Sequence, residues 1–273
     1  MTAPMQMRGR VAVVTGAGGG IGRAIALALA RRGAHLALVD VDAAGLASVA
    51  ESAAALGVRA VVHRFDVRDR AAVAALPEQV RAALGRVDLL VNNAGVALGG
   101  TFEQVGADDF DWLIAINFDA VVRMTRAFLP LLHTSDDARI VNVSSVYGIV
   151  APAGQTAYCA SKFAVRGFSN ALRHELEGSR VGVTVVHPGG VATAIARSAR
   201  APAGVPAEEL ARRRAAAERK LRMPPERAGE IIVRAVERRR ARILVGGDAV
   251  VVSWLERLAP VGYWRLLRRL AEP

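Results

Sequence analysis

Tyr158 and Lys162 are the side chains in this sequence whose types and spacing best suit proton-transfer chemistry. They are four residues apart, in the run Tyr-Cys-Ala-Ser-Lys, so a helix would place both on one face. Lysine is scarce, because Lys162 and Lys220 are the only lysines among the 36 basic residues. An ammonium is a compact point charge and favours the ionised form of a nearby phenol. We therefore hypothesise that Tyr158 is an acid/base whose pKa Lys162 lowers. The alternative is a surface helix with an incidental pair.

The composition favours one sizeable α/β domain without a metal or disulfide cluster. The chain has 273 residues, 52% of them hydrophobic, and no linker divides it. The single cysteine, Cys159, excludes a disulfide framework and a cysteine zinc site, and it fits a reducing cytoplasm. We expect an inert Cys159, with a redox-sensitive thiol as the alternative. The sequence shows no signal-like start and no spanning apolar run, so we predict a cytoplasmic location.

Positive charge is concentrated in the C-terminal part of the chain. The net charge is +11, and residues 195–273 hold 18 basic and 9 acidic residues. Such a local excess suits a surface that faces a membrane or an acidic ligand, or it reflects an arginine-rich composition alone. No nucleic-acid-binding motif accompanies the charge, so we expect no nucleic-acid partner.

A glycine-rich turn follows the first strand-like run. Residues 11–15 are strand-like, Gly16–Gly22 reads Gly-Ala-Gly-Gly-Gly-Ile-Gly, and residues 23–32 are helical. Strand, glycine turn and helix form the setting in which backbone N–H groups bind a phosphate. The spacing is G-x-x-x-G-x-G instead of the commoner G-x-G-x-x-G, and an ordinary glycine turn remains the alternative.

Asp40 ends the second strand-like run, 18 residues after Gly22. A carboxylate at this offset binds the ribose hydroxyls of the adenosine and repels a 2′-phosphate. No lysine or arginine lies inside the glycine turn or directly after Asp40, so the charge pattern favours NAD over NADP. The alternative is that Asp40 only caps the helix that begins near Asp42.

Strand-like and helical stretches alternate along the chain, which predicts a Rossmann-type, doubly wound parallel sheet flanked by helices. Ligands bind at the carboxyl ends of such strands, where Asp66 and Asn93 follow two further runs. Asn117 lies in an otherwise apolar helical stripe, as a satisfied structural amide or as support for a water chain. The expected strands after the second are 58–65, 87–91, 139–143, 181–186 and 242–245; the expected helices are 43–56, 69–84, 108–133, one beginning near Gln155, 207–222 and 226–239.

Taken together, these elements resemble the short-chain dehydrogenase/reductase family over residues 11 to about 195. The matching elements, in the order of the family, are Thr15–Gly22, Asp66, Asn92–Gly95, Asn117, Ser145, Tyr158–Lys162 and Pro188–Thr193.

The resemblance implies an oxidoreductase in which Tyr158 exchanges the hydroxyl proton of the substrate while a hydride moves to or from nicotinamide. Lys162 would hold the nicotinamide ribose, and Asn117 would anchor a water that connects Lys162 to solvent. Ser145 would orient the substrate oxygen, and only the family spacing of thirteen residues to Tyr158 selects it over Ser144. A phenol has a pKa of about 10, and lowering it by about 3 units needs roughly 4 kcal/mol. The positive charges of Lys162 and of an oxidised nicotinamide would both lower the pKa of the phenol.

The resemblance also implies a set of cofactor contacts. Asp66 and Val67 would contact adenine, Asn93 to Gly95 would lie beside its ribose, and Val191 and Thr193 would hold the carboxamide. The full predicted set is Gly16, Gly19, Gly20, Ile21, Gly22, Asp40, Asp66, Val67, Asn93, Ala94, Gly95, Tyr158, Lys162, Pro188, Gly189, Val191 and Thr193.

The domain prediction is one Rossmann-type domain over residues 1–246, with a substrate loop at about 194–222, and an amphipathic C-terminal extension over 247–273. Tryptophans and arginines alternate with leucines in the extension. It would pack on its own subunit, reach over the active site of a neighbour in a homodimer or homotetramer, or lie on an anionic membrane surface as a peripheral contact.

The function predicted from these observations is an NAD(H)-preferring, metal-free alcohol dehydrogenase or ketone reductase. Its small-molecule substrate would be apolar, because expected pocket residues such as Val96, Ala97 and Tyr147 carry no charge. Two alternatives remain: an NADP(H)-linked carbonyl or ketoacyl-type reductase, and a non-catalytic dinucleotide-binding protein. A hydrolase is not predicted, because no Gly-x-Ser-x-Gly surrounds Ser145, and we interpret His187 as a strand-end residue packing behind the cofactor loop.

Overall fold

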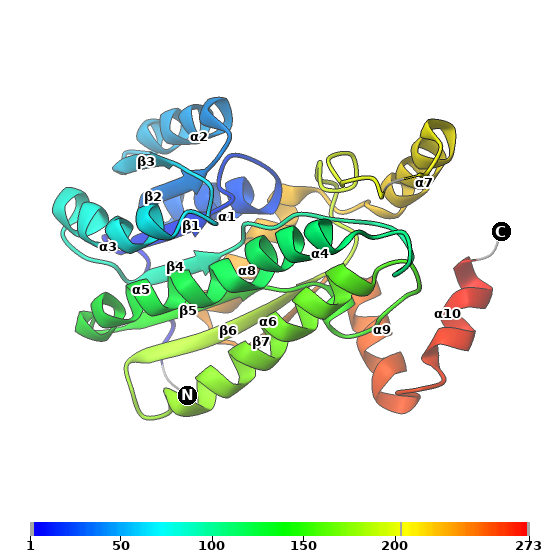
Figure 1. Ribbon diagram of the computed structural model, residues 1–273. Coiled ribbons are helices and arrows are strands. Elements are labelled where there is room, and N and C mark those ends of the chain that lie inside the picture. Colours follow the sequence, from blue (N-terminus) through cyan, green and yellow to red (C-terminus); the bar gives the residue numbers. More distant parts are fainter. Residues whose placement is uncertain (1–2, 203, 272–273) are drawn as a thin grey trace.

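A parallel sheet with the strand order β3-β2-β1-β4-β5-β6-β7 forms the centre of the molecule (Figure 1). The computed structural model describes residues 3–202 and 204–271, and each neighbouring pair of strands in this part is parallel. The order reverses between β1 and β4, which opens a crevice at their carboxyl ends. The strands are β1 (Val11–Thr15), β2 (His35–Asp40), β3 (Ala60–Arg64), β4 (Leu89–Asn92), β5 (Ala138–Val143), β6 (Val181–Pro188) and β7 (Arg242–Val245).

Helices cover both faces of the sheet, because the strands are apolar on both sides. Alternate residues of β1 enter different cores: Ala12 and Val14 pack with α1 and α8, whereas Val11 and Val13 pack with α3 and α5. The helices are α1 (Gly20–Ala30), α2 (Ala43–Ala55), α3 (Arg70–Leu84), α4 (Ala107–Ile114), α5 (Ala120–Thr134), α6 (Thr156–Glu175), α7 (Ala207–Lys220), α8 (Pro225–Glu237), α9 (Gly247–Leu258) and α10 (Tyr263–Ala271).

The predicted fold class is confirmed, but the helix expected over residues 108–133 is interrupted. A π-helical turn, Ala115–Asp119, joins α4 to α5 and contains Asn117. Such turns widen a helix by one residue and occur often at functional sites. Apolar periodicity did not predict this turn, since the apolar stripe continues through it.

The C-terminal extension forms two helices, α9 and α10, joined by a turn. Helix α9 begins at Gly247, where the sequence placed the start of the extension. Residues 1, 2, 203, 272 and 273 of the predicted domains lie outside the described residues. Among the described helices, none is both long and apolar enough to cross a membrane.

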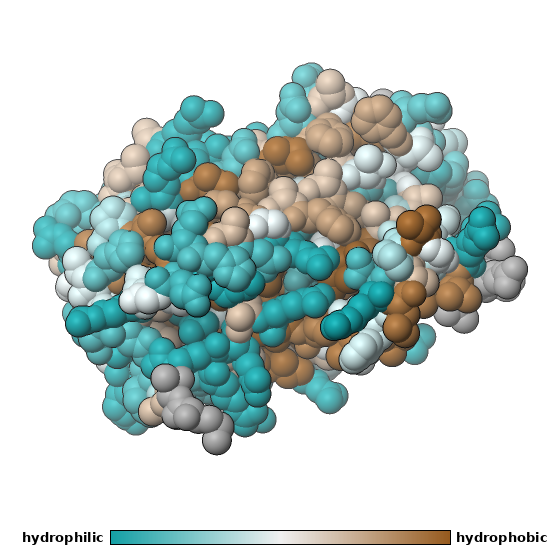
Figure 2. All heavy atoms as spheres, turned by 90° about the horizontal axis from the view of Figure 1, so that it is seen from below, coloured by the Kyte–Doolittle hydropathy of each residue, from teal (hydrophilic) through white to brown (hydrophobic). Residues whose placement is uncertain are grey.

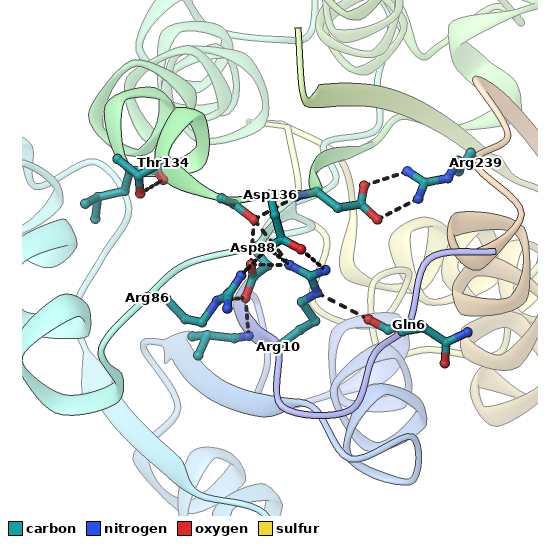
Figure 3. Close-up of polar contacts among 11 residues, drawn as sticks. Gln6, Arg10, Arg86, Asp88, Thr134, Asp136 and Arg239 are labelled. Carbon is teal, nitrogen blue, oxygen red and sulfur yellow. Dashed lines mark hydrogen bonds and ion pairs between the residues drawn. The ribbon is translucent and has the colours of Figure 1, made fainter. Parts of the chain in front are cut away.

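A buried carboxylate, Asp88, organises the end of the sheet opposite to the crevice (Figure 3). It accepts hydrogen bonds from Arg10 at 3.0 Å, from Arg86 at 2.6 Å and from the Ser135 hydroxyl at 2.6 Å. The backbone N–H of Val11, at the start of β1, donates to it as well, at 2.9 Å. Asp88 therefore ties the amino ends of β1 and β4 to the chain that follows α5.

Asp88→Asn is expected to destabilise the fold by about 2 kcal/mol, because two arginines lose a buried anionic acceptor. The free energy of unfolding from urea denaturation measures this. The matched control is Glu78→Gln, which removes a pair with Arg81 that is fully solvent-exposed and should leave the urea midpoint unchanged. Equal midpoints for the Asp88 variant and the native protein would contradict the structural role.

Candidate active site

The glycine turn between β1 and α1 leaves no room for side chains at its core. A Cβ on Gly22 would lie 1.9 Å from the Gly16 carbonyl oxygen and 2.5 Å from Asn93 Nδ2. Gly16 and Gly20 have φ of 65° and 52°, in the region that favours glycine. Gly19, by contrast, has nothing within 4 Å of its Cβ position. The turn thus exposes backbone and the start of α1, beside Ile21, as a phosphate cradle requires.

Asp40 braces this turn from the end of β2. Its carboxylate accepts from the Gly18 N–H at 2.8 Å and from the N–H groups of Val41 and Asp42 at 2.7 and 3.1 Å. Asp42, not Asp40, caps α2, because its side chain accepts from Gly45 N–H. The interpretation of Asp40 as a helix cap is therefore wrong.

Asp66 and Val67 follow β3 at the same edge of the sheet. Asp66 is bound to Arg68 at 2.7 Å, and this hydrogen bond keeps the pKa of the carboxyl below its usual value. Val67 is buried. The sequence did not predict the pairing with Arg68, which leaves Asp66 ionised and fixed at the rim.

Asn93, Ala94 and Gly95 connect β4 to the glycine turn. Asn93 Nδ2 donates to the carbonyls of Thr15 and Gly16 at 3.0 and 3.2 Å. The Thr15 hydroxyl accepts from the N–H groups of Asn93 and Ala94. A Cβ on Gly95 would lie 3.3 Å from Asn117 Oδ1 and 3.4 Å from Lys162 Nζ, so Gly95 packs closely beside both side chains.

Asn117 lies fully buried in the π-helical turn. Its Oδ1 accepts from Val96 N–H at 2.8 Å, and its Nδ2 donates to the Val96 carbonyl at 3.0 Å and to the Ser161 hydroxyl at 3.2 Å. Both amide hydrogens are therefore bonded within the protein. The Ser161 hydroxyl, which no sequence motif singled out, joins Asn117 to the turn of α6 that carries Lys162.

Tyr158 and Lys162 share one face of α6, as their spacing predicts. Lys162 Nζ lies 5.6 Å from the centroid of the Tyr158 ring and donates to the Val143 carbonyl at 3.2 Å. Ser145, two residues after the end of β5, lies near enough to the Tyr158 phenol to lower its pKa by hydrogen bonding. Tyr147 packs edge-on against Tyr158, with ring centroids 6.1 Å apart. A phenol, a hydroxyl and an ammonium thus meet at the carboxyl ends of the strands.

Burial shifts both titratable groups toward their neutral forms. It raises the pKa of Tyr158 to about 12, against a smaller lowering by the bond with Ser145. It lowers the pKa of Lys162 to about 8. Without cofactor the net shift of the Tyr158 pKa is therefore upward, and the lowering by Lys162 stays a prediction for the cofactor-bound enzyme. A nearby positive charge supplied with the cofactor is needed to favour the phenolate.

Ser144 and His187 lie behind Ser145 and not in the site. The Ser144 hydroxyl donates to the Lys162 carbonyl at 2.8 Å, which leaves Ser145 as the serine beside Tyr158. His187 is fully buried, with Nδ1 2.9 Å from the Ser145 carbonyl oxygen. Burial lowers the pKa of His187 to about 4, so the ring is neutral and Nδ1–H donates. His187 thus packs behind Ser145; the strand-end position alone did not reveal this contact.

The pKa of Cys159 is raised by burial to about 12, as for an inert thiol.

The segment after β6, Pro188 to Thr193, closes the cleft from the other side. Gly189 N–H donates to the Val245 carbonyl at 2.9 Å, and Gly190 N–H donates to Asp248 at 2.7 Å. Val191 pairs with Met223, and the methyl group of Thr193 lies 3.0 Å from the Cβ position of Gly20. Thr193 therefore reaches the glycine turn, to which Asp40 and Asn93 are also hydrogen-bonded.

Arg200 fastens the predicted substrate loop onto α4. Its guanidinium lies 3.6 Å from the Trp112 ring centroid and bonds Asp109 at 2.7 Å. Its N–H donates to the Ala97 carbonyl at 3.1 Å. Composition alone suggested a small, flexible segment, and this clamp was not foreseen.

Comparisons with known proteins agree with this geometry. The family model described as short chain dehydrogenase matches residues 10–204. A putative oxidoreductase, SadH, of Mycobacterium tuberculosis is 45% identical over 262 residues, 95% of this chain and 94% of that protein. A short-chain dehydrogenase/reductase from Burkholderia phymatum, solved in complex with NAD, has a TM-score of 0.87 at 33% identity and covers 94% and 95% of the two chains. A metagenomic short-chain oxidoreductase in complex with NADP has a TM-score of 0.64 at 39% identity and covers 67% and 84%.

Proposed function

The chain belongs to the short-chain dehydrogenase/reductase family and is an NAD(P)-dependent oxidoreductase; on this premise we propose that it prefers NAD(H) and interconverts a hydrophobic secondary alcohol with its ketone. The observation that carries the proposal is the meeting of Tyr158, Ser145 and Lys162 beside the glycine turn. The residues fit a dinucleotide, because the close packing at Gly22 holds the glycine turn in shape while the space next to Gly19 is open.

The proton transfer is proposed to run through Tyr158. In alcohol oxidation the phenolate takes the hydroxyl proton, and in ketone reduction the neutral phenol donates it to the carbonyl oxygen. Ser145 orients that oxygen by a hydrogen bond, and Lys162 binds the nicotinamide ribose and stabilises the phenolate. When bound, the nicotinamide accepts or supplies the hydride at C4, and its oxidised ring adds a positive charge. Asn117 holds the Val96 loop and Ser161 beside Lys162, and a water at this corner is the proposed route for protons to solvent.

An apolar substrate is favoured by the surroundings of Tyr158. Tyr158 packs with a cluster that includes Leu98, Leu113 and Val96. Arg200 lies in the predicted substrate loop, but its guanidinium is paired with Asp109 and stacks on the Trp112 ring. The Arg200 charge is therefore already paired within the protein, which favours an uncharged substrate. We also propose a cytoplasmic location and a homodimer or homotetramer, as the resemblance implies.

The test of the proposed function is a panel of secondary alcohols and ketones, assayed with NAD(H) and NADP(H), alongside fluorescence titration of NADH. We expect turnover with apolar members of the panel and a higher kcat/KM with NAD(H). A higher kcat/KM with NADP(H) would favour the alternative, an NADP-linked reductase. One structural relative was solved in complex with NADP, which is why this alternative is tested. Tight NADH binding without turnover would favour a non-catalytic binder.

Asp40→Ala is expected to reduce the preference for NAD over NADP by at least about tenfold, because the carboxylate that repels a 2′-phosphate is gone. The ratio of kcat/KM for the two cofactors measures this. Asp42→Ala is the matched control, since Asp42 caps α2 and should leave the ratio unchanged. An unchanged ratio in the Asp40 variant would refute its role in selection.

Ketone reduction is expected to slow as the pH rises through about 8. Burial lowers the pKa of Lys162 to about 8, so its ammonium is present below that pH and lost above it. Tyr158, with a pKa of about 12, stays protonated and able to donate throughout. The profile of kcat for reduction between pH 6 and 10, taken at saturating NADH, should therefore show one falling limb of about tenfold per pH unit at most. A flat profile would contradict the need for charged Lys162.

A further inference from the structure

The outer face of α9 carries apolar side chains that the protein leaves exposed. Val251, Trp254 and Leu258 follow one another at steps of three and four residues, so they share one helical face. They are 66%, 57% and 79% exposed, and Val261, in the turn that follows, is 90% exposed. A large apolar group of this kind on a surface marks a contact with a partner. We call these four residues the α9 stripe.

The opposite face of α9 is bound to the domain, which fixes the orientation of the stripe. Ala249 is buried, and the Ser253 hydroxyl accepts from Arg242 of β7 at 3.2 Å. Asp248, in the first turn, holds Gly190 of the cofactor-side segment at 2.7 Å. Rotation that would bury the stripe would break these contacts, so the stripe faces outward.

Positive charge accompanies the stripe. Between residues 249 and 268 the only acidic residue is Glu256, and the basic ones are Arg257, Arg265 and Arg268. Glu256 is half-buried, and its negative charge raises the pKa of Arg242, which bonds the inner face of α9. Arg257 and Arg265 are exposed, and the Arg257 guanidinium lies 5.7 Å from the Trp254 ring centroid. An exposed tryptophan among arginines suits the boundary between lipid headgroups and acyl chains.

The stripe lies at the same end of the molecule as the candidate active site. The Tyr263 hydroxyl accepts from Ala151 N–H at 2.9 Å, which ties α10 to the loop before Tyr158. Trp264 borders an open groove of about 530 Å³ that Pro152, Cys159 and Phe163 also line. Figure 1 shows α9 and α10 beside the start of α6, and Figure 2 shows hydrophobic and hydrophilic side chains intermixed at this end.

A second copy of the chain fits this face less well than an anionic bilayer. A two-fold contact brings the same patch of both copies together. Here it would bring Arg257 and Arg265 of both copies into one interface, where the half-buried Glu256 is the only acidic residue between positions 249 and 268. An anionic headgroup layer neutralises these arginines while the stripe enters the acyl boundary.

We propose that the α9 stripe and its arginines form a docking surface for an anionic lipid bilayer. The protein then lies on the membrane with the end of the molecule that holds α9, α10 and the start of α6 facing the lipid. This goes beyond the proposed oxidoreductase activity and does not depend on it, because the binding needs no turnover.

Vesicle flotation of the full chain tests the proposal. Vesicles of phosphatidylglycerol mixed with phosphatidylcholine are compared with vesicles of phosphatidylcholine alone. We expect binding to the anionic vesicles, at least tenfold weaker binding to the neutral ones, and loss on raising the salt from about 50 mM to about 500 mM.

Two pairs of matched variants locate the contact. Leu258→Ser with Val261→Ser should reduce flotation at least tenfold. The control is Leu56→Ser with Val62→Ser, the same residue types, each 44% exposed and far from α9, which should not reduce it. Arg257→Glu with Arg265→Glu should abolish it, whereas Arg70→Glu with Arg126→Glu, which changes the net charge equally, should leave most of it. Oxidoreductase activity on a water-soluble substrate and thermal unfolding confirm that all four variants fold.

Three results would overturn the proposal. One is absence of flotation with anionic vesicles at low salt. Another is flotation that the α9 variants leave intact, since the contact would then lie elsewhere. The third is that Leu258→Ser with Val261→Ser converts a dimer or tetramer to a smaller species in analytical ultracentrifugation, because the stripe would then be an interface between copies.

Discussion

Tyr158→Phe is expected to lower kcat by about 100- to 10,000-fold, the range that a general acid/base contributes. The substitution removes one oxygen and leaves the ring, so the edge-on contact with Tyr147 at 6.1 Å between centroids is kept. The phenol oxygen beside Ser145, which is the proposed donor and acceptor of the substrate proton, is lost.

The measurement is steady-state turnover together with NADH titration of the same preparation. The affinity for NADH should change by less than about threefold, because the proposed role of Tyr158 is with the substrate proton and that of Lys162, which the variant keeps, is with the ribose. Tyr147→Phe is the matched control, since it removes a neighbouring phenol and should keep most of the activity. Turnover of the Tyr158 variant near that of the native enzyme would remove Tyr158 from the proton transfer.

Lys162→Met is expected to lower kcat/KM by about 10- to 1,000-fold, since an opposite charge 4–6 Å away shifts a pKa by 1 to 3 units. Lys162 Nζ lies 5.6 Å from the Tyr158 ring centroid and is almost completely buried, so water does not screen it. Unlike Tyr158→Phe, this change should also weaken NADH binding, because Lys162 is proposed to hold the ribose.

Lys220→Met provides the control, as the only other lysine of the chain lies exposed at the end of α7. It should change neither rate nor binding. Lys162→Met with native kcat/KM would show that the ammonium has no part in the reaction, and native NADH affinity would show that it does not hold the cofactor.

Much of the fold could be predicted from the sequence, because strand periodicity and the carboxyl-end polar residues report local structure. The runs that end in Asp40, Asp66 and Asn93 became β2, β3 and β4, and their ends meet beside the glycine turn. Parallel strands with short helical connections leave few other arrangements. Family resemblance supplied the roles of Ser145 and Asn117, which periodicity alone leaves open.

The features that could not be predicted from the sequence depend on contacts between residues far apart in the chain. In the π-helical turn, the Asn117 amide is bonded to Val96 and Ser161, which lie 21 and 44 positions away in the chain. The pairing of Arg200 with Asp109 spans 91 residues, and composition suggested only a flexible loop. The pKa of Tyr158 rises because the pocket is buried, whereas the sequence suggested the opposite direction from the spacing to Lys162. Burial is a property of the packed fold and cannot be read from a four-residue interval.

The most direct test of the central claim follows the hydride itself. The best alcohol from the substrate panel is prepared with deuterium on the carbinol carbon and oxidised by the native enzyme with NAD⁺. We predict NADH that carries one deuterium at C4 of the nicotinamide ring, seen by mass spectrometry and NMR, and no such product from Tyr158→Phe in the same time. Deuterium released to the solvent, or deuterated NADH formed equally fast by the Tyr158 variant, would contradict hydride transfer with Tyr158 as the acid/base.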